Sequence, residues 1–218
     1  MARGNQVCYG EEPNCLAPGA LPMNVVVTDL PDVLVIEPRL FGDERGFFLE
    51  TYQAARYAAC GVVRPFVQDN ISRSAAGVLR GLHLQNPRTQ GKLVSAIRGR
   101  VLDVAVDVRL GSPDFGRHVA VELSEENRRQ LWIPRGFAHG FLVLSDTADV
   151  FYKCDDLYSP ADEIVVRWND PAIGIAWGVD SPLLSARDAA APLLSQLANL
   201  PVFGQVQDQV QDQVSGPA

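Results

Sequence analysis

The sequence has few cysteines, no long apolar run and no excess of basic residues, and each shortage excludes a class of protein. The four cysteines, Cys8, Cys15, Cys60 and Cys154, form no CxxC pair and match no zinc-binding spacing. With 19 Lys and Arg against 26 Asp and Glu, the net charge is −7, so the chain has no general attraction for a nucleic-acid backbone. No stretch approaches the roughly 18–20 apolar residues of a membrane span, and the start, MARGNQVCYGEEPN, lacks the apolar core of a secretory signal. We therefore expect a cytoplasmic protein with reduced thiols that binds neither nucleic acid nor membrane.

The 218 residues are 47% hydrophobic and 21% charged, which is typical of a globular protein with one sizeable core. Residues 1–24 are rich in Gly and Pro without periodicity, which indicates a flexible N-terminal arm. The repeat QVQDQVQDQV near the other end predicts a low-complexity tail over residues 201–218. Between them, residues 25–200 show no linker and are expected to form a single domain.

The pattern of that domain predicts an all-β fold with short helices. In the run VLDVAVDV, Leu102, Val104 and Val106 alternate with Asp103 and Asp107, which predicts a strand with one dry face and one wetter face. Turn residues separate this run from similar ones, and many short strands at such spacing favour a jelly-roll sandwich or barrel. The expected strands are residues 47–51, 78–85, 92–97, 101–108, 117–123, 140–145, 149–153 and 163–168.

Two helical segments are also expected, at residues 53–60, ending at Gly61, and near the C-terminus at residues 185–197, interrupted by Pro192. No GxGxxG follows a strand and no P-loop is present, so the sequence gives no support for a tightly held dinucleotide.

Two of the three histidines lie in segments that resemble the motifs of the cupin superfamily. The segment PRGFAH, ending at His139, matches the PxGxxH of the second motif, and VLRGLHLQ, with His83, stands at the first. Metal-binding cupins carry a second histidine where this chain has Gln85, so an imidazole ligand is missing. We therefore expect no metal. From the residues alone, either histidine also fits a structural role in a strand.

A longer series of segments resembles the dTDP-4-dehydrorhamnose 3,5-epimerase family, which has a cupin jelly-roll fold. The resemblance covers Pro31 to about Leu197, in family order. The matching segments are IEPRLFGDERGFFLETY, FVQDNISRS, VLRGLHLQ, QGKLV, GRVLDVAVDVR, QLWIPRGFAHGF, FYK and LSARDAAAPLL.

The resemblance implies an isomerase that needs no cofactor and acts on dTDP-4-dehydro-6-deoxy-glucose at carbons 3 and 5, giving dTDP-4-dehydro-L-rhamnose. The catalytic residues it implies are His83 as base, Asp188 as the carboxylate that orients His83, Tyr152 as acid and Lys92 beside the enolate oxygen. Each role is chemically reasonable, because an imidazole accepts protons near neutral pH and a phenol can return one. Without the resemblance, Tyr152 would pass for a core aromatic, Asp188 for a helix N-terminal charge and Lys92 for a solvated strand end.

The resemblance also implies substrate-binding residues. Arginine suits a diphosphate, and an aromatic ring such as that of Tyr158 can stack on a base. Arg187 stands where a lysine is frequent in the family. The full set is Arg45, Glu50, Gln68, Asp69, Asn70, Arg80, His139, Tyr158, Glu163 and Arg187. Family members are homodimers that exchange N-terminal strands, so we expect a homodimer in which Arg45 and Glu50 reach the neighbour's pocket.

Three alternatives remain open from the sequence. A related enzyme that epimerises only carbon 3 or carbon 5 would keep the same base and acid. A non-catalytic cupin that binds nucleotide sugars would keep the binding residues, and a metal-dependent cupin oxygenase would need the ligand that Gln85 replaces.

One detail does not fit a regular strand. Arg80 and His83 are three residues apart, so their side chains should point to opposite faces, and yet both are assigned to one pocket. Gly81 between them could mark a bulge, or one residue could reach the site in another way.

Overall fold

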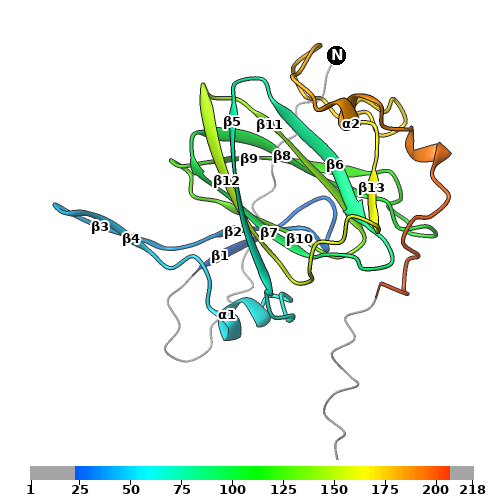
Figure 1. Cartoon of the computed structure of the whole chain (residues 1–218). Helices are drawn as coiled ribbons and strands as arrows, with labels where there is room; N and C mark the ends of the chain where they lie inside the picture. The colour runs from blue at the N-terminus through cyan, green and yellow to red at the C-terminus, as the bar shows by residue number, and fades with distance from the viewer. Residues whose placement is uncertain (1–22, 207–218) are drawn as a thin grey trace, which may run out of the picture.

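The computed structural model describes residues 23–206, which fold into a sandwich of two antiparallel sheets with a projecting hairpin (Figure 1). The six-stranded sheet has the order β1 (Asn24–Val27), β2 (Leu34–Glu37), β10 (Gln130–Ile133), β7 (Lys92–Arg98), β12 (Thr147–Cys154) and β5 (Gln68–Ala75). The five-stranded sheet has the order β13 (Glu163–Val165), β6 (Leu79–Gln85), β11 (Phe137–Val143), β8 (Arg100–Asp107) and β9 (His118–Ser124). Strands β3 (Leu40–Asp43) and β4 (Gly46–Leu49) pair only with each other. The expected all-β fold with short helices is confirmed.

Every run expected to be a strand contains one, although β13 stops at Val165, three residues before the expected end. The sequence reasoning missed five strands, β1, β2, β3, β5 and β10. Strand β5 reads QDNISRSA, and it was missed because it carries almost no hydrophobic signal. Its alternate residues are half-buried and exposed, as expected of a strand whose inner face lines a polar cavity.

The expectation of a wetter face on β8 is wrong, because both faces of this strand are covered. Val101 and Ala105 face the core between the two sheets. Val104 and Val106 pack on the other side, against a cluster that includes Trp177. Trp177 and several other members of that cluster come from the C-terminal segment, which lies over the outer face of the five-stranded sheet (Figure 1).

The two aspartates on the supposedly wetter face are fully buried, and each is stabilised by a specific partner. Asp103 contacts the ring of His139, and Asp107 accepts hydrogen bonds from Arg109. A charged carboxylate can be buried only when it has such a partner. These contacts explain how aspartates alternate with apolar residues on a strand that is buried on both faces.

The expected C-terminal helix is broken into two short pieces. Helix α2 (Ala186–Ala189) begins after its N-cap Ser185, and a single 3-10 turn follows at Leu194–Gln196. Proline cannot donate a backbone hydrogen bond, and the carbonyl of Pro192 instead accepts from the N–H of Arg167. The other helix, α1 (Ala54–Ala58), lies within the expected residues 53–60.

Strand β6 contains the bulge that Gly81 suggested. His139 on β11 faces His83, whereas Phe141, two residues further along β11, faces Arg80, three residues back along β6. The extra residue lets Arg80 and His83 line the same cavity despite their opposite parity. Gly81 has a φ of +125°, and a Cβ there would lie 2.6 Å from the Cα of Gly140. Only glycine fits both the backbone conformation and the close approach of the two strands.

The packed part of the chain runs past residue 200, since Leu110 forms a β-bridge with Val202 and the ring of Phe203 lies on Arg109. Most of the expected N-terminal arm and residues 207–218 of the expected tail lie outside the described residues. Within residues 23–206, no helix is long and apolar enough to cross a membrane.

Candidate active site

A cavity of about 520 Å³ lies where the two sheets and the C-terminal segment meet. Strands β5, β6, β7, β11, β12 and β13 contribute side chains to it, and residues 183–188 form one wall. A second cavity of about 300 Å³ adjoins the first, and both are lined by His83, Lys92, Tyr152 and Glu163. All four residues expected to be catalytic line the larger cavity, so the fold brings together groups that are far apart in the sequence.

His83 and Asp188 form the central contact of the site. Nε2 of His83 lies 2.6 Å from Oδ1 of Asp188, across 105 residues of sequence. Burial pushes the pKa of Asp188 up, but hydrogen bonds from His83, Ser185 and the Gly81 backbone more than offset this and leave it below its usual value. Asp188 is therefore a carboxylate at neutral pH and holds one ring nitrogen of His83 as a donor. The other nitrogen is then left to accept a proton.

Tyr152 and Lys92 lie on neighbouring strands of the six-stranded sheet. Tyr152 on β12 pairs in register with Val94 on β7, and Lys92 pairs with Cys154. Burial raises the pKa of Tyr152, which keeps the phenol protonated. Burial lowers the pKa of Lys92, which forms no ion pair with any described residue. The site thus holds a proton donor and a lysine that forms no ion pair with any described residue, although Asp103 and Glu163 are near enough to favour its charged form.

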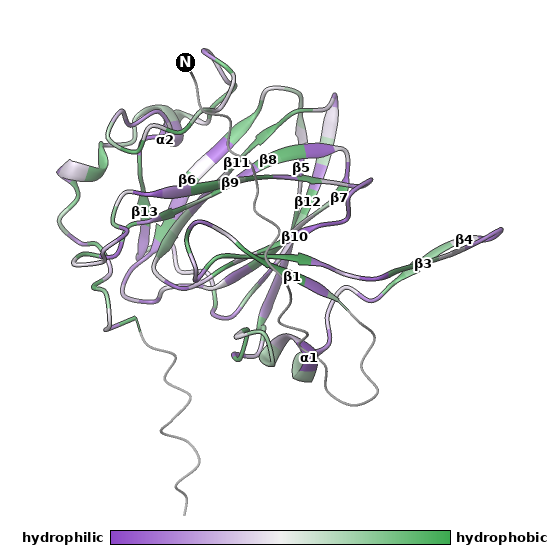
Figure 2. Ribbon diagram, turned by 180° about the vertical axis from the view of Figure 1, so that it is seen from behind, coloured by the Kyte–Doolittle hydropathy of each residue, from purple (hydrophilic) through white to green (hydrophobic). Residues whose placement is uncertain are grey.

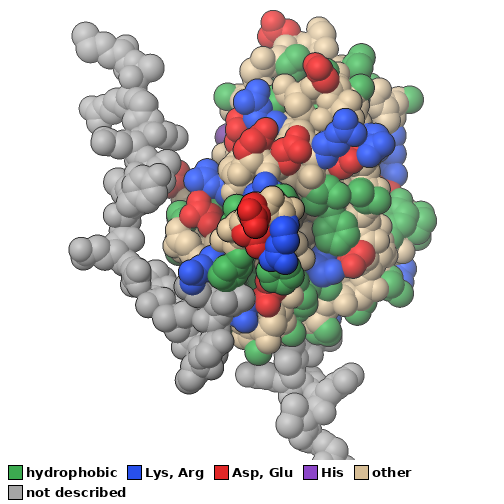
Figure 3. Space-filling view, turned by 90° about the vertical axis from the view of Figure 1, so that its left-hand side faces the viewer, with side chains coloured by type: hydrophobic (Ala, Val, Ile, Leu, Met, Phe, Trp, Pro, Cys, Tyr) green, Lys and Arg blue, Asp and Glu red, His purple; other side chains and the backbone are tan. Residues whose placement is uncertain are grey.

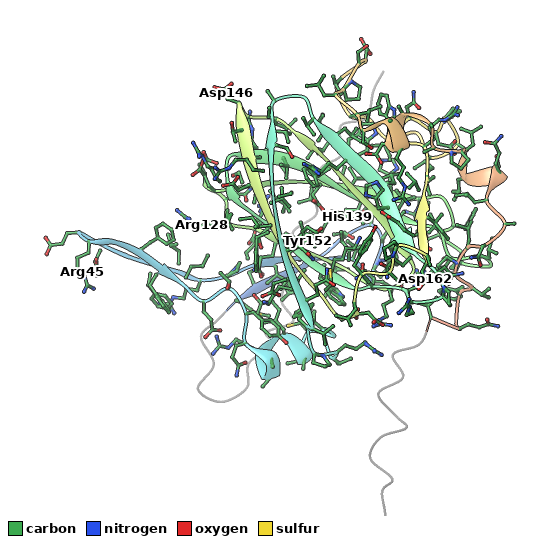
Figure 4. All side chains as sticks on the ribbon, viewed as in Figure 1. Arg45, Arg128, His139, Asp146, Tyr152 and Asp162 are labelled. Atoms are coloured by element: carbon green, nitrogen blue, oxygen red, sulfur yellow. The ribbon has the colours of Figure 1, made fainter. Side chains whose placement is uncertain are left out.

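His139 forms a second His–Asp contact at the back of the cavity. Its Nε2 lies 3.0 Å from Oδ2 of Asp103, and both residues are buried. In Figure 4, His139 and Tyr152 lie between the sheets, in the middle of the molecule. The ring of His139 lies 6.4 Å from that of Phe141, another lining residue.

The charges at the mouth of the cavity are partly neutralised within the chain. Glu163 accepts a hydrogen bond of 2.6 Å from the Tyr158 hydroxyl and forms an ion pair with Arg187. Arg80, in contrast, donates through Nε to the Ser74 hydroxyl and pairs with no carboxylate among the described residues. Arg80 and Lys92 therefore give the cavity a local positive charge, although the whole chain is acidic.

Four of the expected binding residues line the smaller cavity: Gln68, Asn70, Tyr158 and Glu163, which also lines the larger one. Gln68 accepts a hydrogen bond from the Tyr158 backbone and donates one to Asn70. Asp69 does not join them, since it lies on the opposite face of β5 and pairs with Lys153. Its side-chain direction follows from the period-2 alternation of the strand.

Arg45 and Glu50 also lie outside the cavities of their own chain. Arg45 is at the tip of the β3–β4 hairpin, far from Tyr152, and its side chain is 85% exposed (Figure 4). Glu50 forms an ion pair with Arg56 of α1. One chain therefore brings together eleven of the fourteen expected residues and leaves Arg45, Glu50 and Asp69 outside.

The sequence reasoning missed several lining residues. Ser72 and Phe141 follow expected residues at a spacing of two, so strand periodicity could have found them. Asp103 lines neither cavity but is the partner of His139. That contact could not be predicted, because it depends on how β8 and β11 pair. Leu183 and Leu184 carry no polar signal, and only the fold places them at the cavity.

Gln85 stands at the position where metal-binding cupins have a histidine ligand, and here its side chain holds two loops. Its amide donates to the carbonyls of Arg88 and Leu157 and accepts from the backbone N–H of Ser159. The side chain is buried, and its hydrogen bonds go to two loops, one of which carries Tyr158. Gln85 therefore fixes the loop that borders the smaller cavity.

A jelly-roll sandwich with a His–carboxylate pair, a buried tyrosine and a buried lysine around one cavity defines an acid–base enzyme of the cupin type. The comparisons with known proteins agree with this class. The family model described as dTDP-4-dehydrorhamnose 3,5-epimerase matches residues 27–196. The chain belongs to this family.

Individual relatives support the same assignment. The chain is 56% identical over 168 residues to the dTDP-4-dehydrorhamnose 3,5-epimerase of Shigella flexneri, which covers 76% of this chain and 93% of the relative. A relative of the same name from Neisseria gonorrhoeae is 53% identical over 80% of this chain, which spans only 53% of that longer protein.

Among solved structures, the dTDP-6-deoxy-D-glucose-3,5-epimerase of Legionella pneumophila in complex with dTDP-4-keto-L-rhamnose matches with a TM-score of 0.81 and 54% identity. The match covers 83% of this chain and 98% of that one.

Proposed function

We propose that this protein epimerises dTDP-4-dehydro-6-deoxy-glucose at carbons 3 and 5, giving dTDP-4-dehydro-L-rhamnose. The observation that carries the proposal is the contact of His83 with Asp188 at a cavity that Tyr152 and Lys92 also line. The substrate's ketone acidifies the C–H bonds on both neighbouring carbons. Each inversion then needs only a base on one face, an acid on the other and stabilisation of the enolate between them.

The roles follow from the electrostatics of the site. His83 removes the proton from carbon, and the carboxylate of Asp188 stabilises the imidazolium that forms. The electrons of the broken C–H bond move to the ketone oxygen, where the cation of Lys92 stabilises the negative charge. Tyr152 then donates its phenolic proton to the opposite face of the carbon. Solvent returns a proton to the phenolate and takes up the proton that His83 removed, so both groups are ready for the next inversion. The raised pKa of Tyr152 supports this role, because the group stays protonated until the carbanion forms.

The nucleotide part of the substrate fits the remaining groups. Arg80 has no carboxylate partner within the described residues, which makes it available to a diphosphate oxygen. The half-exposed ring of Tyr158 at the smaller cavity offers a surface for the thymine base. Glu163 and Arg187 hold the Tyr158 hydroxyl in place on the C-terminal side.

We also propose a homodimer in which the β3–β4 hairpin crosses to the neighbour. Phe47 and Phe48 on this hairpin are 57% and 66% exposed, which is costly for rings in water. Figure 2 shows the hairpin green along its length and purple at its tip, and Figure 3 shows hydrophobic side chains gathered beside the charged ones on this side of the molecule. Such a hairpin would deliver Arg45 to a second copy, consistent with its distance from the cavity of its own chain. The cytoplasmic location stays a prediction.

Proton NMR of the purified protein with the 4-keto sugar nucleotide in heavy water tests the proposed reaction. Because each inversion exchanges a carbon-bound proton with solvent, we expect deuterium at both C3 and C5. Label at a single carbon would indicate an enzyme that epimerises only that carbon. Binding without any label would indicate a non-catalytic nucleotide-sugar-binding protein.

A further inference from the structure

A buried ionic cluster lies next to the cavity without lining it. Asp155 follows directly after β12, and Arg135 lies in the turn between β10 and β11. Their side chains are 1% and 12% exposed, and Nε of Arg135 donates to Oδ2 of Asp155 over 3.0 Å. A buried ion pair of this kind adds little net stability, because the cost of removing both charges from water offsets their attraction. The role of this ion pair must therefore be found in the other groups that Asp155 and Arg135 contact.

Those contacts converge on the residue that precedes Lys92. The backbone N–H of Gly91 donates to Oδ1 of Asp155 over 2.7 Å, and the N–H of Asp155 donates back to the Gly91 carbonyl over 3.1 Å. Arg135 also donates to the backbone carbonyl of Asp155. A Cβ on Gly91 would lie 2.6 Å from the ring of Trp132 and 2.7 Å from the Asp155 carboxylate. The backbone at Gly91 is thus held on both sides.

The same cluster connects the ends of the strands that carry the candidate catalytic groups. Lys92 is the first residue of β7, and it pairs with Cys154, the residue before Asp155. Tyr152 lies two residues before Cys154 on β12. The long side chain of Lys92 has no ion-pair partner among residues 23–206, so its position depends on where its backbone is held.

We propose that Asp155, held by Arg135, is a positioning residue that fixes the backbone at Gly91 and thereby places the ammonium group of Lys92 against the substrate's enolate oxygen. This proposal rests on the proposed role of Lys92. Asp155 lines neither cavity, so its effect passes through the backbone that it holds at Gly91, directly before Lys92.

Asp155→Asn is the informative substitution, since it keeps the shape of the side chain. The Gly91 N–H and the Arg135 guanidinium bind different oxygens of Asp155, and an amide has only one oxygen, so one of the two contacts is lost in this geometry. Displacement of a catalytic group by about 1 Å can cost up to about 100-fold, so we expect kcat to fall by about 10- to 100-fold. KM should change little, because the enolate forms only after the substrate has bound.

A double-mutant cycle with Lys92→Met separates positioning from general destabilisation. If Asp155 acts through Lys92, Asp155→Asn should reduce kcat in the wild-type background and cause no further loss in Lys92→Met. Asp149→Asn is the matched control. Like Asp155, Asp149 is a buried aspartate that accepts hydrogen bonds from an arginine, here Arg73. It lies near the other end of β12, outside both cavities. We expect its kcat to remain that of the wild type.

Wild-type kcat in folded Asp155→Asn, or an equal loss in both backgrounds, would overturn the positioning role. If Asp155→Asn does not fold, as judged by circular dichroism, Arg135→Lys enters the same cycle and decides, because it keeps the charge and the Gly91 contact but loses the planar fork. If Lys92→Met alone retains kcat, the role proposed for Lys92 fails and the inference fails with it. Loss in Lys92→Met without loss in Asp155→Asn refutes only the inference.

Discussion

At the scale of single residues, the chemistry of His83 depends on a partner that lies 105 residues away in the sequence. A histidine in a strand is ordinary, and only the carboxylate of Asp188 at 2.6 Å fixes which ring nitrogen carries the proton. His139 has a similar partner in Asp103 and also lines the cavity, but its side chain is 8% exposed, against 32% for that of His83. The two pairs therefore differ in access to substrate rather than in composition.

His83→Ala should lower kcat by about 10²- to 10⁴-fold, the range typical for loss of a general base. Binding of the nucleotide sugar should persist, because Arg80 and Tyr158 are unchanged. Steady-state kinetics together with calorimetric titration of the sugar nucleotide would check both parts. Near-normal turnover in this variant would contradict the assignment of His83 as base.

Lys92→Met should make the protein more stable while it lowers activity. Burial lowers the pKa of Lys92 from its ordinary 10.5, which means that the folded protein carries this charge at a cost. Removing such a functional charge typically adds about 0.5–2 kcal/mol to the free energy of unfolding. Urea denaturation at pH 7 would measure the gain, and Lys153→Met, which alters an exposed ion pair with Asp69, would serve as control.

The gain from Lys92→Met should shrink as the pH rises toward 10.5. Between the lowered pKa of the folded state and 10.5, the unfolded wild-type chain binds a proton that the folded chain has released. The stability of the wild type therefore rises with pH across this window, whereas the variant has no such group. A gain that stayed constant up to pH 10.5 would show that Lys92 is not strained by burial.

At the scale of elements, the bulge in β6 is the feature that makes the site possible. The sequence contained the clue, because Arg80 and His83 could share a pocket only if the strand departed from regular alternation. Gly81 pointed to the place of that departure, and the shifted pairing with β11 confirmed it. The break in the helix expected at residues 185–197 was harder to predict from the sequence. It depends on a hydrogen bond from the N–H of Arg167 to the carbonyl of Pro192, which joins distant segments.

Gly81→Ala should destabilise the fold and displace both Arg80 and His83. The methyl group would meet the Cα of Gly140 at 2.6 Å and the carbonyl of His139 at 2.8 Å, in a backbone conformation with φ of +125°. Backbone strain alone costs about 1–3 kcal/mol, and the steric clash adds to it.

Gly77→Ala is the matched control, because Gly77 also has a positive φ but a Cβ there meets nothing within 4 Å. Urea denaturation should show a clearly larger loss for Gly81→Ala than for Gly77→Ala. Equal losses would mean that the close approach of β6 and β11 does not matter.

At the scale of the whole molecule, the sequence predicted the sheet-based architecture and eleven of the residues that line the two cavities, for identifiable reasons. The roles given to those residues stay predictions. Strands with hydrophobic alternation were visible, whereas β5 was hidden because its inner face is polar. The catalytic candidates came from ordered family segments, since no spacing in the sequence could connect His83 with Asp188. Arg45 and Glu50 lie away from the cavities of one chain, so their role depends on assembly, which neither sequence pattern nor a single chain determines.

Mixing two inactive variants tests whether Arg45 works in the neighbour's cavity. In a dimer of one His83→Ala chain and one Arg45→Ala chain, the cavity of the second chain would have an intact His83 and would receive Arg45 from the first. With random exchange of subunits after co-refolding, half of the dimers are mixed and each has one complete site, so about a quarter of the wild-type rate should return. Arg73→Ala, which removes an arginine from the outer face of β5, replaces Arg45→Ala as the control and should be active by itself. If Arg45→Ala is inactive alone and the mixture stays inactive while native mass spectrometry shows mixed dimers, Arg45 serves its own chain and the strand exchange is wrong.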